Sequence, residues 1–116
     1  MNLLQLTNIN ELYGAIRQSS TIPVFFFKHS TRCPISKTAE SEYLSFADNN
    51  ASNKNVVFTH LDLIKYRDIS DAIATELGIT HQSPQVILVI NEVSVWSASH
   101  DDITQESLTE VLARNL

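Results

Sequence analysis

Residues 24–36 read Val24-Phe25-Phe26-Phe27-Lys28-His29-Ser30-Thr31-Arg32-Cys33-Pro34-Ile35-Ser36. The apolar start predicts a strand that is covered on both faces, and Pro34 suits the first position of a helix. Cys33 is therefore expected at a helix N-terminus, where free backbone N–H groups and the helix dipole stabilise a thiolate. Because the thiolate is the nucleophilic form of cysteine, we predict that Cys33 is a reactive, catalytic residue.

Cys33 is the only cysteine in the chain. An inert, buried thiol is the alternative interpretation, but the neighbours Arg32 and Pro34 do not favour an apolar core position. We expect Lys28, Arg32, Pro34 and Ser36 to stabilise the thiolate. Ser36 stands where a Cys-x-x-Cys motif has its second cysteine, so the site has one thiol, and the Ser36 hydroxyl is expected to donate a hydrogen bond to it.

The composition indicates one globular domain over residues 1–116, with 43% hydrophobic and 18% charged residues. A net charge of −5 argues against nucleic acid as a partner. The longest apolar run is too short to span a membrane, and the N-terminus lacks a signal-peptide pattern. A lone cysteine forms no internal disulfide, so we expect a reducing, cytoplasmic location. We also expect a monomer.

Hydrophobic periodicity predicts an α/β fold. Helices are expected from Thr7 or Asn8 to the Ser19-Ser20-Thr21 segment and over 34–47, 68–77 and 103–116; strands are expected over 22–27, 55–63, 86–90 and 93–96, the last two joined by a turn at Asn91-Glu92. This order predicts a thioredoxin-like fold, with a four-stranded mixed sheet flanked by helices on both faces. Cys33 would then follow the C-terminal end of the first strand, where α/β sheets place their sites.

The dipeptide Ser83-Pro84 directly precedes the third predicted strand. In the thioredoxin architecture a cis-proline lies at this point and faces the cysteine loop; a trans proline that opens an edge strand is the alternative. We expect Thr31, His81, Ser83 and Pro84 to bind substrate, since the backbone of Ser83 could pair with an extended thiol substrate.

The other histidines have weaker assignments. His29 lies four residues before Cys33 and raises the local positive potential, His60 lies within a strand and is expected to be structural, and His100 has no role that spacing assigns. No Cys/His pair has metal-ligand spacing, so we expect no metal. An iron–sulfur cluster would require a dimer and exogenous thiols, because each chain supplies one thiolate.

Three segments resemble the YtxJ-type monothiol bacilliredoxins, which are cytoplasmic, thioredoxin-like proteins of bacteria that use bacillithiol. They are Lys28-His29-Ser30-Thr31-Arg32-Cys33-Pro34-Ile35-Ser36, His81-Gln82-Ser83-Pro84-Gln85, and Trp96-Ser97-Ala98-Ser99-His100 with Asp102-Ile103-Thr104. The resemblance implies a thiol–disulfide oxidoreductase that removes bacillithiol from mixed disulfides on S-bacillithiolated client proteins. It also implies that Cys33 is the nucleophile, Ser36 the non-thiol fourth position and Pro84 the cis-proline.

Two other functions stay open at this point. The first is a monothiol glutaredoxin-like protein that uses another low-molecular-weight thiol, in which case the small thiol differs but the chemistry of Cys33 does not. The second is a non-catalytic adaptor that binds a partner strand between Cys33 and Pro84. Loss of the thiol in Cys33→Ser would leave binding by an adaptor intact but abolish the activity of an exchange enzyme.

Overall fold

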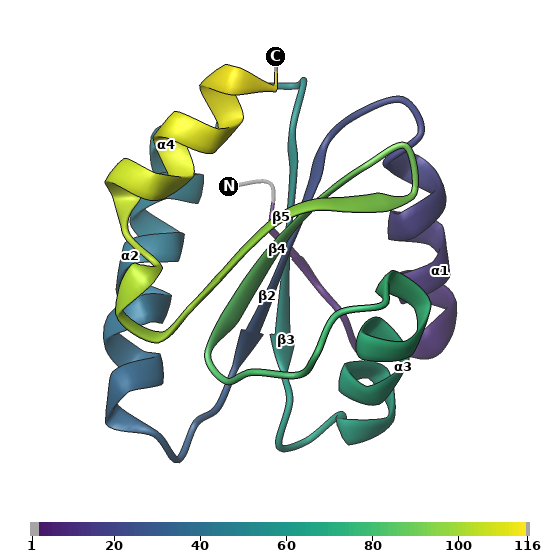
Figure 1. Ribbon diagram of the computed structural model, residues 1–116, viewed down its shortest axis with the longest axis vertical. Coiled ribbons are helices and arrows are strands. Elements are labelled where there is room, and N and C mark those ends of the chain that lie inside the picture. The colour runs from purple at the N-terminus through teal and green to yellow at the C-terminus, as the bar shows by residue number, and fades with distance from the viewer. Residues whose placement is uncertain (1–2, 116) are drawn as a thin grey trace.

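The computed structural model describes residues 3–115, in which five strands form one mixed sheet with helices on both faces (Figure 1). In chain order the elements are β1 (Leu3–Gln5), α1 (Ile9–Gln18), β2 (Val24–His29), α2 (Pro34–Asn49), β3 (Val57–Asp62), α3 (Arg67–Leu77), β4 (Gln85–Ile90), β5 (Val93–Ser99), the 3₁₀ helix η1 (His100–Asp102) and α4 (Gln105–Arg114). The strand order across the sheet is β1-β3-β2-β4-β5. The first three of these strands run parallel, and β4 and β5 are antiparallel to their neighbours.

The predicted α/β arrangement is found, but the count of four strands is wrong. The fifth strand is β1, which pairs with the outer edge of β3 and places Leu3 beside Phe58. Its three residues, Leu3-Leu4-Gln5, show neither alternation nor β-branched side chains. Only the pairing with β3 makes this segment a strand, so its own sequence carries no signal for one.

Two apolar layers hold the helices to the sheet, with α2 and α4 on one face and α1 and α3 on the other (Figure 1). Phe25 and Phe27 point into the layer under α2 and α4, whereas Val24 and Phe26 point into the layer under α1 and α3. All four side chains are fully buried. The unbroken apolar run of β2 therefore follows from burial on both faces of a central strand.

The observed boundaries differ from the predicted ones by a few residues. The strand β2 continues two residues past Phe27 and ends at His29, and α2 ends at Asn49. The last helix begins only at Gln105, after η1; its predicted end at Leu116 lies outside the described residues. None of the helices within residues 3–115 has the length and apolar character needed to cross a bilayer.

The β4–β5 turn has left-handed backbone at both central residues, with φ of 55° at Asn91 and 63° at Glu92. Two positive φ values are typical of a type I′ hairpin turn, which favours Asn-Gly over Asn-Glu. The turn is held by Ser19 at the end of α1. The Ser19 carbonyl accepts from the Asn91 N–H at 2.7 Å, and its hydroxyl accepts from the Glu92 N–H at 2.9 Å.

We predict that Glu92→Gly stabilises the protein by about 0.5–1 kcal/mol. Glycine adopts a positive φ without the steric penalty of a Cβ, and part of this gain is offset because glycine makes the unfolded chain more flexible. Urea unfolding measures the change. Glu92→Ala is the control, since alanine keeps the Cβ and should bring no gain. Equal stabilisation by both variants would contradict the backbone argument.

Candidate active site

Cys33 is the residue that precedes the first turn of α2, and its backbone is extended, with φ −113° and ψ 120°. In the described part of the chain no side chain caps this helix end, and the first turn of α2 contains no acidic residue. The loop turns sharply before the helix, because the Cys33 N–H donates to the Ser30 carbonyl at 3.3 Å. The partly exposed thiol thus lies at the positive end of a helix of 16 residues, as the sequence predicts.

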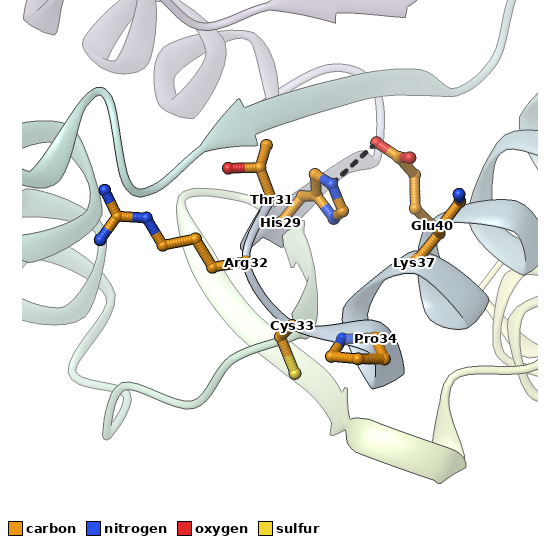
Figure 2. A pocket seen from close by; sticks show the side chains of 7 residues that line it. All are labelled: His29, Thr31, Arg32, Cys33, Pro34, Lys37 and Glu40. Atoms are coloured by element: carbon orange, nitrogen blue, oxygen red, sulfur yellow. Dashed lines mark ion pairs between the residues drawn. The ribbon is translucent and has the colours of Figure 1, made fainter.

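A cavity of about 460 Å³ borders the cysteine loop. Seven residues line it: His29, Thr31, Arg32, Cys33, Pro34, Lys37 and Glu40. The cavity therefore includes four of the residues predicted for the site. Figure 2 shows that the Cys33 sulfur points away from His29 and Glu40, and that the Arg32 side chain extends away from the sulfur. The direct stabilisation of the thiolate that we expected from Arg32 is not seen in this arrangement.

Ser36 does not have the expected hydrogen bond to the sulfur. Its side chain is fully buried, and its hydroxyl oxygen accepts from the Ser30 N–H at 2.9 Å and lies 2.9 Å from His29 Nδ1. Within residues 3–115 no hydrogen bond joins Ser36 to the Cys33 sulfur. The hydroxyl instead contacts His29 at the end of β2 and Ser30 at the start of the loop.

Lys28 also points away from the thiol, because neighbouring residues of a strand face opposite sides of the sheet. Its ammonium lies on the α3 side, where it donates to the Ser70 carbonyl at 3.2 Å and is 3.2 Å from His81 Nδ1. Burial lowers the pKa of Lys28 to about 8, and the nearby Asp71 carboxylate opposes this effect. The pKa of His81 is lowered by burial first and by the positive charge of Lys28 second.

The Ser83-Pro84 peptide bond is cis, as the architecture predicts. Gln85 pairs with Lys28, so Pro84 lies at the same end of the sheet as the cysteine loop. The Pro84 carbonyl accepts from the His100 N–H at 3.2 Å, which gives His100 a backbone role that spacing did not indicate. The hydroxyl of Ser83 is buried and has no hydrogen-bond partner within the described chain.

Sequence reasoning missed a group formed by the buried His29 and His60 and the partly exposed Glu40. Nε2 of His60 lies 2.8 Å from Glu40 Oε2, and Nε2 of His29 lies 3.5 Å from the same oxygen (Figure 2). Glu40 follows Ser36 by one helical turn, which was the available signal. Among residues 3–115, no three His, Cys, Asp or Glu side chains are arranged to hold a metal ion.

The comparison with protein families decides the assignment. The family model of the monothiol bacilliredoxin BrxC matches residues 4–108. The chain belongs to this family. The resemblance found in the sequence is thereby confirmed, and the match covers the sheet from the second residue of β1 and the start of α4.

Solved structures agree on the fold. A proposed oxidoreductase with a thioredoxin fold is 30% identical, with a TM-score of 0.84 over 96% of this chain and 94% of that one. The germline-specific thioredoxin Deadhead from Drosophila melanogaster is 16% identical, with a TM-score of 0.71 over 97% and 98%. A thioredoxin from Malassezia sympodialis is also 16% identical, with a TM-score of 0.74 over 97% and 89%. The fold is thioredoxin-like, and the family is one of thiol–disulfide oxidoreductases.

The buried lysine gives a prediction for pH dependence. Between about pH 8 and 10.5 the unfolded chain holds a proton on Lys28 that the folded protein has lost, so folding becomes more favourable as the pH rises. Relative to Lys28→Met, the free energy of unfolding of the wild type should rise by about 1–2 kcal/mol from pH 7.5 to 9.5. Urea unfolding at both pH values tests this; parallel profiles of the two proteins would show that burial does not lower this pKa.

Proposed function

We propose that this protein removes bacillithiol from mixed disulfides on client proteins and that Cys33 is its nucleophile. The observation that carries the proposal is the lone, partly exposed thiol at the uncapped N-terminus of α2 in a chain of the BrxC family. The uncapped N–H groups and the helix dipole favour the thiolate. This backbone effect replaces the side-chain contacts that we expected from Lys28 and Ser36.

The reaction is a thiol–disulfide exchange. The Cys33 thiolate attacks the bacillithiol sulfur of the mixed disulfide, a new S–S bond forms, and the electron pair of the old bond leaves on the client sulfur, which then takes a proton from solvent. The client cysteine is reduced, and Cys33 carries bacillithiol. Because Cys33 is the only cysteine, a second small thiol or another oxidoreductase must release it.

Substrate contacts belong to this proposal as well. Ser83, Pro84 and His81 lie at the same end of the sheet as Cys33, and the backbone of Ser83 would pair with the client segment that carries the mixed disulfide. Thr31 lies beside Cys33 on the cavity wall. The partners are bacillithiol and S-bacillithiolated proteins, and a reducing cytoplasm is the compartment that suits a lone thiol.

Two exposed cations beside the cysteine favour a small thiol that carries negative charge. Arg32 and Lys37 line the cavity of Cys33, and neither has an ion-pair partner within residues 3–115. They lie in a chain with a net charge of −5. A local positive potential of this kind raises the rate at which an anionic substrate arrives.

The central test is intact-mass spectrometry after the reduced protein is mixed with a bacillithiolated client. We expect the mass of bacillithiol to appear on the wild type and not on Cys33→Ser, because serine offers no thiolate at neutral pH. A glutathionylated client in parallel identifies the small thiol, and transfer from the bacillithiolated client should be faster. If neither mass appears on folded wild-type protein, the exchange reaction is refuted and an adaptor is favoured.

We predict that Arg32→Glu combined with Lys37→Glu lowers the rate of transfer from an anionic mixed disulfide by about tenfold at low ionic strength. The loss should shrink toward 1 M salt, where charges are screened within about 3 Å. Lys54→Glu is the matched control, because Lys54 is an exposed cation in the loop before β3, at the other end of the sheet. A salt-independent loss would mean that the charges do not steer the substrate.

A further inference from the structure

Ser30, the first residue of the loop that carries Cys33, is held through both its backbone carbonyl and its backbone N–H. The Ser30 carbonyl accepts from the Cys33 N–H at 3.3 Å, and the Ser30 N–H donates to the Ser36 hydroxyl at 2.9 Å. Ser30 is 8% exposed and Ser36 is fully buried, so the bond between them is shielded from solvent. The first turn of α2 thus reaches back and fixes the end of β2.

A side chain of the sheet in turn contacts the Ser36 hydroxyl. His29 Nδ1 lies 2.9 Å from it, and on the other side of the ring His29 Nε2 faces Glu40. His60 Nε2 contacts the same carboxylate at 2.8 Å, and its buried Nδ1 has no hydrogen-bond partner among residues 3–115. A carboxylate oxygen can only accept, so this contact calls for a proton on Nε2 of His60.

One assignment of protons satisfies all of these contacts. With a proton on Nε2 of each imidazole, both rings face Glu40 with N–H groups, and Nδ1 of His29 accepts the Ser36 hydroxyl proton. The Ser36 oxygen then remains free to accept the Ser30 N–H. In this arrangement the single hydroxyl proton of Ser36 is used by His29 and is not available to a thiolate.

We propose that Ser36 and His29 are positioning residues for Cys33: they hold the 30–33 loop on the sheet and thereby fix the direction in which the thiol points. The role rests on the proposed exchange reaction, in which a small misalignment of the attacking sulfur with the disulfide lowers the rate strongly. It also gives a reason for serine at the fourth position, since a thiol is a weak hydrogen-bond acceptor and would hold the Ser30 N–H poorly.

The chain contains a matched control for Ser36→Ala. Ser19 is also a buried serine, 1% exposed, whose hydroxyl accepts a backbone N–H at 2.9 Å, but it holds the β4–β5 turn instead of the cysteine loop. We expect both Ser36→Ala and Ser19→Ala to lower the urea midpoint to a similar degree. Only Ser36→Ala should slow the transfer of the small thiol to Cys33, by about tenfold or more.

A double-mutant cycle tests the link to the sheet. His29→Phe keeps a ring against Phe27 but removes Nδ1, so it should slow transfer as Ser36→Ala does, and the double variant should be no slower than the slower single variant. Transfer by Ser36→Ala at the rate of Ser19→Ala would overturn the proposal. So would fully additive losses in the cycle.

A readout that does not depend on the exchange reaction separates this proposal from the proposed function. Amide hydrogen exchange at Ser30 should become faster in Ser36→Ala and stay unchanged in Ser19→Ala. If wild-type Cys33 takes up no small thiol while this pattern holds, the proposed function fails and the positioning of the loop stands. If the Ser30 amide stays protected in Ser36→Ala, the positioning role is refuted, whatever the activity.

Discussion

The end of β2 imposes the constraint on which the site depends. This strand lies in the centre of the sheet with neighbours on both edges and helices on both faces, so every side chain along it is buried. After four apolar residues, Lys28 and His29 bring polar groups into that interior, where each must find partners. Lys28 finds Ser70 and His81 on one face, and His29 finds Ser36 and Glu40 on the other. The two halves of the site are thus attached to one strand.

Much of the fold could be predicted because it depends on local patterns. The apolar run 24–27 and the proline after Cys33 fixed the position of the thiol, and helical spacing located all four long helices within a few residues. The strand β1 could not be predicted, since its three residues become a strand only beside β3. The Asn91-Glu92 turn was located correctly. Asn-Glu is a weak sequence signal for this turn type, and the turn forms because Ser19 at the end of α1 accepts hydrogen bonds from it.

The site was predicted less completely than the fold, for a physical reason. Position along the chain showed that Lys28, Arg32 and Ser36 lie near Cys33, but it does not determine where their polar atoms point. The strand runs two residues further than its apolar pattern, and alternation then sends Lys28 toward α3. Ser36 turns inward because the Ser30 N–H is buried and needs an acceptor. Glu40 and His60 meet only through the packing of α2 against β3.

The hydrogen bond from Ser30 to Ser36 has an evolutionary consequence. A single codon change converts serine to cysteine, so a two-thiol enzyme looks one step away from this sequence. In this protein that step would also replace the hydroxyl that accepts the Ser30 N–H with a weaker acceptor, so the second thiol would come with a more loosely held cysteine loop. The architecture of the loop therefore favours the one-thiol state.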